Sequence, residues 1–564
     1  MQNKLALPIL LMILISLPLG YGVFGFIWGM IGQGIEWPIR DFIAKSFSNL
    51  NKSALVDSSI FSIKVAVLST LIALILCYIF IVYAFLKNQF KLISILMGAI
   101  FIIPHPTFAI LLELTFSNAS MLERWLTWFI VSERPILPNT TSLIHSPSGG
   151  FYILAMAIKE APFIWFILLG VTLTHDFKNQ IKVAQSLGYE EAFAIIRCIL
   201  PQIYQHLKFP LYTIIIFVIG HVEMAVILAP FEPQTLGVMI LTLFNETNEF
   251  SRHQAFLLGG WLIILGLFAL LLFHLIIKIC SDLFHFIMTH HSAIKKSYSV
   301  RYLMNGVPIL NFFIGFTLVL GIIGLFILSV ATYWPYPMLW PESLTLVHWK
   351  EVAILSLPLL FNTLLIAFIS VLFSLIIVMF LIEITKGTKV RHYASMLLFL
   401  PLLMPMIGFL LGILILLNQL NIPPFFAVVI GHMIYMMPYF YFMLQKPLAA
   451  FDKRWLYASL SLGKTPAYSY FFVKIRLLIH PIIFTVLLGF IISFNQYLPT
   501  FLLSGGEIET LNSQALIFAQ GGSKRLLAAF AIMQIALSLL ILLMGGLLWK
   551  CTRKSELYSE SAIG

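Results

Sequence analysis

The segment IKVAQSLGYEEAFAIIRCILP, residues 181–201, is polar and charged although long apolar stretches lie before and after it. A second version, LYASLSLGKTPAYSYFFVKIR, occupies residues 456–476. Both contain a small residue, three further residues, a glycine and an apolar-x-apolar ending. Because Gly188 and Gly463 can adopt backbone conformations that other residues avoid, each segment is expected to form two short helices that meet at a sharp bend. A helix–turn–helix of this kind between membrane spans can dock on a soluble partner.

These two segments resemble the EAA loop found in the permeases of ATP-binding-cassette (ABC) importers. Lys182 and Tyr457 stand where the family's motif has glutamate, and only the first segment keeps the terminal Leu-Pro. In that family the loop docks in a cleft of a cytoplasmic ATPase subunit, so the resemblance implies two ATPase copies, one for each loop. The alternative is a pair of amphipathic helices at the membrane surface without a partner. The resemblance assigns coupling to Ala184, Gly188, Leu200 and Pro201 in the first segment and to Ala458, Ser459, Gly463, Val473 and Ile475 in the second.

The composition is that of a polytopic helical membrane protein. The 564 residues are 60% hydrophobic and only 10% charged, with a mean hydropathy of +0.99, which excludes the soluble globular class. The net charge of +11 is not gathered with aromatic residues into a nucleic-acid surface, so no nucleic acid is expected. The four cysteines form neither a CxxC pair nor a ligand spacing, so we expect no metal site, no disulfide scaffold and no cofactor.

About twelve apolar stretches are each long enough to span a bilayer as a helix. The first is interpreted as a retained span because it is too long for a signal-peptide core. Lys and Arg are enriched in cytoplasmic loops of membrane proteins, and most of the 34 fall there if the N-terminus is inside. This predicts cytoplasmic termini and cytoplasmic EAA-like loops. The expected spans are residues 5–30, 60–86, 92–117, 151–175, 209–230, 254–279, 306–334, 353–383, 393–417, 424–445, 481–503 and 526–549.

The sequence repeats once along its length. Residues 161–168, APFIWFIL, align with residues 437–444, MPYFYFML, and an EAA-like loop follows each at a similar distance. Six spans in each repeat give both halves the same orientation, which is a parallel repeat. The predicted organisation is a first permease half at residues 1–280 (core 60–279), a cytoplasmic linker at 281–303 and a second half at 304–564 (core 353–549).

One chain here supplies both membrane halves, and in this it resembles the fused, double-length permeases of the thiamine and ferric-iron branch of ABC importers. The ending VKIR at residues 473–476 is similar to the thiamine-permease variant of the EAA loop. QYLPTFLLSGG at residues 496–506 is most similar to an uncharacterised inner-membrane paralogue of that permease. The resemblance implies two tandem type I permease halves in a bacterial inner membrane. It also implies a periplasmic binding protein that delivers a small solute, with a thiamine-like compound as first choice and ferric iron as second.

Four polar residues within predicted spans are candidates for a central substrate path, because polar groups inside a membrane usually face a cavity or the bundle interior. A carboxylate there would suit a cationic substrate. One alternative is a helix–helix hydrogen bond without a ligand role. A different class of function, a proton-coupled secondary transporter that uses Glu223, also remains open. The four residues are His221, Glu223, Asn495 and Gln496.

Two short motifs imitate nucleotide-binding sequences. Residues 458–465 end like a P-loop but lack its first glycine and a preceding strand, and residues 503–507 imitate an ABC ATPase signature at the outer end of a span. We therefore expect no ATPase in this chain and no enzymatic activity of its own. His105 and His432 are interpreted as interior histidines with satisfied hydrogen bonds, and Lys159 and Glu160, adjacent in sequence, are expected on different helix faces.

Overall fold

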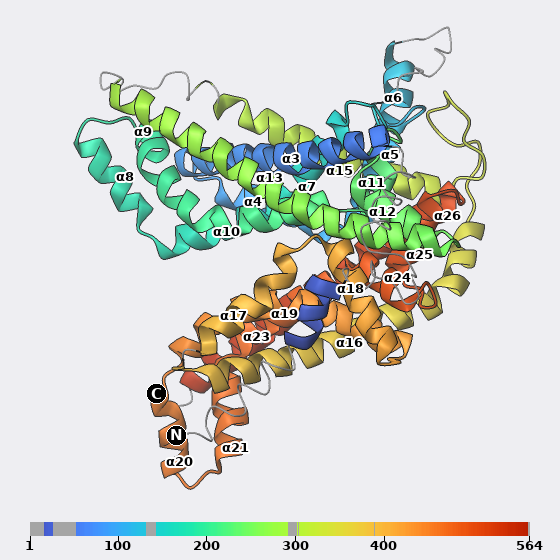
Figure 1. Ribbon diagram of the computed structural model, residues 1–564. Coiled ribbons are helices and arrows are strands. Elements are labelled where there is room, and N and C mark those ends of the chain that lie inside the picture. Colours follow the sequence, from blue (N-terminus) through green and yellow to red (C-terminus); the bar gives the residue numbers. More distant parts are fainter. Residues whose placement is uncertain are drawn as a thin grey trace.

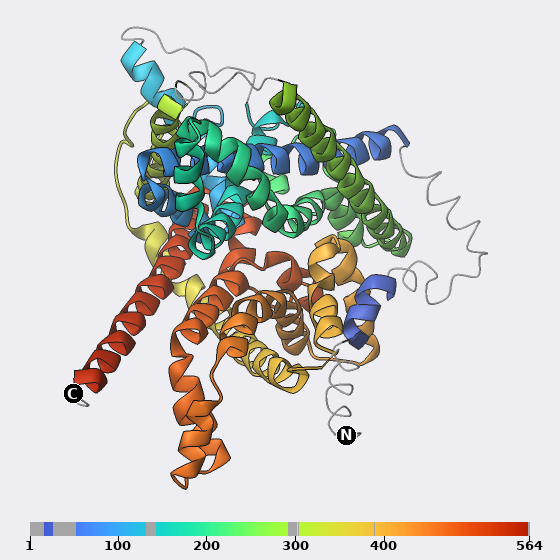
Figure 2. The same ribbon diagram turned by 90° about the vertical axis from the view of Figure 1, so that its left-hand side faces the viewer.

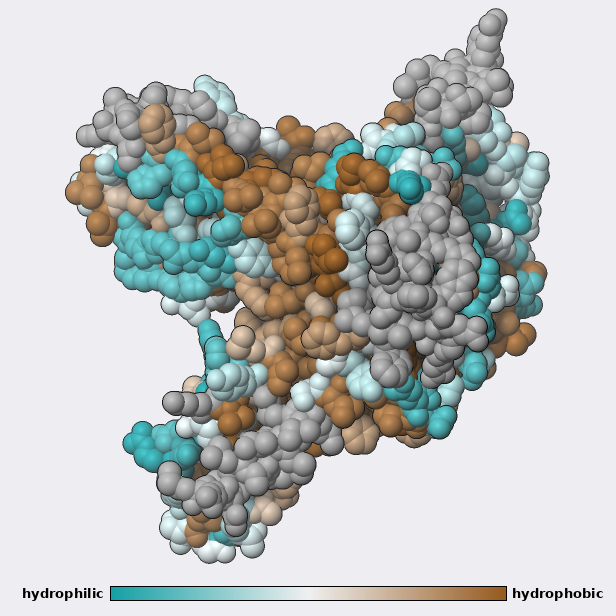
Figure 3. Space-filling model, in the orientation of Figure 1, coloured by the Kyte–Doolittle hydropathy of each residue, from teal (hydrophilic) through white to brown (hydrophobic). Residues whose placement is uncertain are grey.

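The computed structural model describes residues 16–25, 52–130, 143–290, 302, 304–388 and 390–561. Every named element in these ranges is a helix, and the chain is an all-α polytopic membrane protein. Most of the first predicted span and most of the predicted linker lie outside the described residues. Figure 3 shows a broad apolar band between more polar ends, which is the surface expected of helices that cross a bilayer.

We call the described residues before 291 the first half and those after 301 the second half. The order of helices in the first half recurs in the second. The first half contains α3 (Lys52–Lys87), α4 (Phe90–Ile102), α5 (His105–Phe116), α6 (Met121–Ile130), α7 (Gly150–Thr174), α8 (Phe177–Ser186), α9 (Glu191–Ala194), a π-helix (Ile195–Ile199), α10 (Leu200–Ile219), α11 (Glu223–Leu228), α12 (Leu236–Asn245) and α13 (Glu249–His290).

The second half begins with α15 and then follows the same plan. Its long helices α16, α19 and α26 correspond to α3, α7 and α13 of the first half. The helices are α15 (Val307–Val330), α16 (Val347–Thr385), α17 (Val390–Phe399), a 3₁₀ turn (Leu400–Leu403), α18 (Met406–Gln419), α19 (Pro424–Ala450), α20 (Arg454–Ser461), α21 (Pro466–Tyr468), a π-helix (Ser469–Lys474), α22 (Ile475–Leu477), α23 (Ile479–Phe494), α24 (Tyr497–Ser504), α25 (Leu511–Ala519) and α26 (Lys524–Ser561).

The correspondence extends to single hydrogen bonds at the start of α12 and α25. Thr235 and Thr510 are the N-caps of these helices, and each side chain accepts a backbone N–H of the first turn. The residue directly after each N-cap donates its backbone N–H to a hydroxyl on α3 in the first half and on α16 in the second. Leu236 N–H donates to Ser62 Oγ over 2.8 Å, and Leu511 N–H donates to Thr363 Oγ1 over 3.1 Å. The two halves therefore anchor the same element in the same way.

Several predicted spans are broken in the middle. Seven described helices are long and apolar enough to cross a membrane, and three bent pairs would raise the number to ten. The expected straight spans at residues 92–117 and 393–417 are bent by 102° and 112°, because Pro104 and Pro405 act as the N-caps of α5 and α18. A third bend, of 75°, separates residues 466–477 from α23. The span expected at residues 209–230 is also interrupted, at Gly220 between α10 and α11.

The first helix of each half packs on the other half. In the described helical segment 16–25, Gly25 approaches Gly412 of α18 so closely that an added Cβ would lie 2.7 Å from Gly412 Cα. In α15 an added Cβ at Gly321 would lie 2.4 Å from the Leu111 side chain of α5. Small residues let helix backbones approach closely in membranes. The two halves are therefore interlocked by exchanged helices.

The two halves join at one end and separate at the other. Figure 1 shows α5, α11, α12, α18, α24 and α25 together at the joined end, and the polar hairpins α8–α9 and α20–α21 at the far ends of two diverging lobes. The space-filling view in Figure 3 shows a notch between the lobes that opens on the side of the hairpins. Helix α26 ends on this same side. Both polar hairpins thus lie at one face of the molecule.

Candidate functional site

The bend expected at each glycine is present, and it has the same geometry in both hairpins. Gly188 has φ of 85° and Gly463 has φ of 76°, in the left-handed region that favours glycine. Tyr189 N–H donates to Ala184 O over 3.1 Å, and Lys464 N–H donates to Ser459 O over 3.2 Å. In addition, Gly188 N–H donates to Gln185 O and Gly463 N–H donates to Leu460 O. Together these bonds form a Schellman motif at the end of α8 and of α20.

The small residues of both frames face inward, and the glycines face open space. Ala184 and Ser459 are buried, and Ser459 Oγ accepts a hydrogen bond of 2.9 Å from Ser469 Oγ of the following π-helix. No atom lies within 4 Å of a Cβ built on either glycine. The other predicted coupling positions lie at the hairpin ends or on the surface: Leu200 and Pro201 start α10, Val473 and Ile475 flank Lys474, and Ala458 is exposed.

Charged side chains are buried at the break between α4 and α5 in the first half. Lys159 Nζ donates to Ile100 O over 2.9 Å and also to Ile103 O, so the ammonium satisfies carbonyls that the broken helix leaves free. Glu160 turns to another face and its Oε1 lies 3.3 Å from His105 Nε2. Lys159 and Glu160 are thus on different faces, and His105 has a hydrogen-bond partner, as the sequence predicted.

Glu223 connects the first half to the second. Its Oε1 accepts a 3.2 Å hydrogen bond from Tyr497 N–H at the start of α24, where a helix N-terminus favours a carboxylate. Its Oε2 and His221 Nε2 are buried without a hydrogen-bond partner among the described residues. The ring centroids of His221 and His105 are 5.1 Å apart. This cluster therefore holds buried groups with unused hydrogen-bonding capacity at the boundary of the halves.

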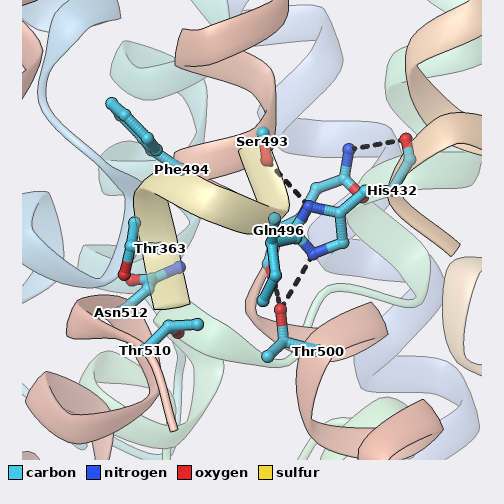
Figure 4. Close-up of a pocket in the computed structure, with 9 residues that line it drawn as sticks. Thr363, His432, Ser493, Phe494, Gln496, Thr500, Thr510 and Asn512 are labelled. Carbon is cyan, nitrogen blue, oxygen red and sulfur yellow. Dashed lines mark hydrogen bonds between the residues drawn. The ribbon is translucent and has the colours of Figure 1, made fainter. Parts of the chain in front are cut away.

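The corresponding region of the second half is neutral, and its histidine is fully hydrogen-bonded. His432 Nδ1 lies 2.8 Å from Ser493 Oγ, and its Nε2 lies 2.9 Å from Thr500 Oγ1. Gln496 Nε2 donates to His432 O over 3.3 Å, and Asn495 donates to Ile491 O within its own helix. Figure 4 shows His432 and Gln496 on one side of a small cavity, with Thr363, Thr510 and Asn512 on the other. His432 is thus an interior histidine with both ring nitrogens satisfied, as expected.

The cavity has a volume of about 10 Å³, which is room for about one water molecule. Gln496 Oε1 and both polar side-chain atoms of Asn512 are buried there without a partner among the described residues. Nothing in the sequence pointed to Asn512, because α25 gives no polar motif around it. Among the described residues no three His, Cys, Asp or Glu side chains gather into a group that could hold a metal ion.

The structure brings only part of the predicted path together. Glu223 accepts a hydrogen bond from the backbone N–H of Tyr497, the residue after Gln496, while Asn495 donates to a carbonyl of its own helix. The helix ends make His221, rather than Glu223, the counterpart of Gln496, because α10 stops at Gly220 and α23 stops at Asn495.

No family model matches the chain. The chain is 25% identical over 454 residues to the inner membrane ABC transporter permease protein YnjC of Escherichia coli strain K12, and the match covers 79% of each protein. This likeness supports the ABC permease family. It supports a permease subunit of an ABC transporter, a class of protein that in general works with partner ATPase subunits.

Proposed function

We propose that this chain is the transmembrane subunit of an ABC importer. Two copies of a cytoplasmic ATPase would dock on the hairpins at Gly188 and Gly463. A periplasmic binding protein would deliver the substrate from the other side of a bacterial inner membrane. The observation that carries the proposal is the pair of matched Schellman hairpins on one face of the molecule, on the side where the lobes separate.

The helices that follow the hairpins offer a mechanical route to the centre. After the first hairpin, α10 runs for 20 residues, about 30 Å of helix, and ends beside His221. After the second, α22 and α23 run to Asn495. Closure of two ATPase subunits would move both hairpins and rock the halves between inward-open and outward-open states. In the second half Lys474 of the π-helix also pairs with Glu383 of α16, which ties that hairpin to a long helix.

The coupling role is tested by Gly188→Leu and Gly463→Leu in proteoliposomes that contain the chain and its ATPase. A β-carbon at a positive φ strains the bend, so uptake should fall while ATP hydrolysis persists. Gly170→Leu is the matched control, because Gly170 also has no atom within 4 Å of a built Cβ and lies in a helix with ordinary φ. Unchanged uptake in both hairpin variants contradicts the coupling role.

For the substrate we propose a small solute, with a thiamine-like cation first and ferric iron second. The unpartnered Glu223 Oε2 supports a cation, because a buried carboxylate oxygen needs a donor or a positive charge. His221, Asn495 and Gln496 would line the same path. Uptake assays with labelled thiamine and with ferric iron separate the two choices.

The same carboxylate favours one alternative, a secondary transporter driven by protons through Glu223. That reading predicts uptake that follows a proton gradient without ATP and loses this dependence in Glu223→Gln. The importer predicts uptake that requires ATP and is unaffected by collapse of the gradient. Proteoliposomes loaded with ATP, or given a pH gradient alone, distinguish the two.

The proposed orientation places the N-terminus, the C-terminus and both hairpins in the cytoplasm. The proposed division is residues 1–280, 281–303 and 304–564. Supporting observations are the recurring helix order and the end of α26 on the hairpin side. Labelling of single cysteines introduced at residues 187 and 462 from outside intact spheroplasts tests the orientation, and strong labelling contradicts it.

A further inference from the structure

The two hairpins differ in how they are held to the body of the protein. We call residues 177–199 loop one and residues 454–477 loop two. Loop one is anchored by buried apolar side chains, among them Phe177, Ile181 and Phe193. In loop two the buried residues are polar or charged: Ser459, Ser469 and Lys474. Loop two therefore has little apolar anchoring of its own.

On the exposed faces the difference is reversed, and loop two is the hairpin with the larger aromatic surface. Leu187 and Leu462 precede the two glycines and are 66% and 79% exposed, so both hairpins present a leucine at this position. Loop two adds Trp455 and Tyr457, which are 59% and 62% exposed. Counted back from the glycine, loop one has Gln180 and Lys182 at these two positions, and both are exposed. Loop two thus presents an aromatic strip that loop one lacks.

Charge separates the hairpins as well. Loop two and the residues leading into it expose Lys453, Arg454 and Lys464. Two acids beside loop two are already paired: Asp452 with Arg454 at 2.7 Å, and Glu383 of α16 with the buried Lys474. The backbone N–H of Arg454, together with its guanidinium, lowers the pKa of Asp452 below its ordinary value. Around loop one, bases and acids are balanced: Lys178, Lys182 and Arg197 stand against Asp176, Glu190 and Glu191.

We propose that the two loops are unequal docking sites for the ATPase and that loop two holds its subunit more tightly. This rests on the proposed function. Loop two would insert Trp455, Tyr457 and Leu462 into an apolar cleft with an acidic rim that complements its lysines and arginine. Loop one would make a smaller contact centred on Leu187. Aromatic anchors buried at the centre of an interface supply most of its affinity.

The shape of loop two favours a protein cleft over a lipid surface. Figures 1 and 2 both show α20 and α21 projecting beyond the ends of the long helices of their lobe. A helix bound to a lipid surface would instead lie flat in the interface plane. The shared Schellman geometry of the two hairpins also fits one kind of partner for both.

The test uses the full chain in nanodiscs and the ATPase subunit that co-purifies with it, purified separately and titrated by calorimetry. The expected binding curve has one tight and one weak site. Trp455→Gln with Tyr457→Lys, which gives loop two the residues of loop one, should weaken the tight site by about tenfold or more. The matched variant Gln180→Trp with Lys182→Tyr should strengthen the weak site. All four positions are exposed, and the bond that Gln180→Trp removes, from Gln202 Nε2 to Gln180 Oε1, is exposed as well, so thermal stability should change little.

Two equal sites, or a tight site that survives the loop-two variant, would overturn the proposal while leaving the ABC importer intact. An ATPase that fails to bind at any concentration would overturn the proposed function as well. Nanodiscs with brominated anionic lipid test the other occupant. If the fluorescence of Trp455, taken as the difference between the wild type and Trp455→Phe, is quenched by that lipid, the strip lies on the membrane and the docking proposal is wrong.

Discussion

Lys159 in α7 and Tyr435 in α19 each stand one turn before the proline of their helix, and both reach the bent helix pair of their own half. Lys159 donates to carbonyls at the α4–α5 break, while Tyr435 OH donates to Met406 O over 3.5 Å at the start of α18. The next residue is Glu160 in the first half and the buried, apolar Met436 in the second. Corresponding positions thus carry charge in one half and apolar or neutral groups in the other.

The same difference holds at the helix breaks that face the centre. Beyond Gly220 the first half places His221 and Glu223, and beyond Asn495 the second half places Gln496 and the apolar Leu498. The same helices and breaks therefore form whether these positions are charged or neutral. Because the neutral half keeps the same breaks without charges, the breaks themselves do not depend on the charges, although Lys159 satisfies the break of its own half.

The largest effect should come from Lys159→Met. This change leaves the carbonyls of Ile100 and Ile103 without a donor, and it removes the buried cation whose charge acts on Glu160 and Glu223. Loss of one partner from a buried charge cluster costs about 3–5 kcal/mol. Thermal unfolding in detergent should show a large fall in stability. Tyr435→Phe is the control, since its single long bond should contribute less than about 1 kcal/mol, and equal effects would contradict the contrast.

Gly408→Ala should have the next largest effect, at the contact between α18 and α13. A Cβ at Gly408 would lie 2.9 Å from Gly259 O, a backbone atom that cannot move by itself. Overpacking of this kind costs about 1–3 kcal/mol. The corresponding contact of the repeat is between α5 and α26, where Thr107 Oγ1 donates a hydrogen bond to Gln534 Oε1.

Thr107→Ala should therefore be milder, at about 0.6–1.7 kcal/mol for one hydrogen bond inside a membrane. Both variants are compared by thermal unfolding in the same detergent. A Gly408→Ala protein as stable as the wild type would mean that the halves are not packed this closely.

His432→Leu should lower stability by about 1–2 kcal/mol, because it removes contacts to both Ser493 and Thr500. His221→Leu should change stability little, since Nε2 has no partner among the described residues, but it should reduce uptake if the first half handles the substrate. Thermal unfolding and uptake measured on both variants separate the two roles. The reverse pattern would assign the substrate path to the second half.

Local features were predictable from the sequence and long-range ones were not. The bends at Gly188 and Gly463 depend on the glycine and its neighbours, so the pattern predicted them. The breaks at Pro104 and Pro405 were missed because a hydropathy window averages over a proline. The bond from Tyr497 to Glu223 joins segments from different halves, and no local pattern encodes it. The assignment of coupling to the hairpins stays a prediction.

The smallest effect should come from Asn512→Leu, and it tests how the second half tolerates its cavity. Asn512 lies where the first half has Gly237, which packs so closely on Gly220 that an added Cβ would be 3.1 Å from its carbonyl oxygen. The second half has Asn495 in place of Gly220, and Asn512 lines the small cavity seen in Figure 4. Both polar side-chain atoms of Asn512 lack a partner among the described residues.

An apolar side chain of similar volume removes the need to satisfy these two groups. Exchange of unsatisfied polar groups for apolar ones is near neutral or mildly stabilising, so thermal unfolding should shift upward by less than about 1 kcal/mol in stability. Thr510→Val is the matched control in the same cavity lining, because it removes the N-cap of α25 and should cost about 0.5–2 kcal/mol. If Asn512→Leu is instead the more damaging change, the asparagine holds a tightly bound water molecule, and the second half has a polar centre as necessary to its fold as Lys159 is to the first.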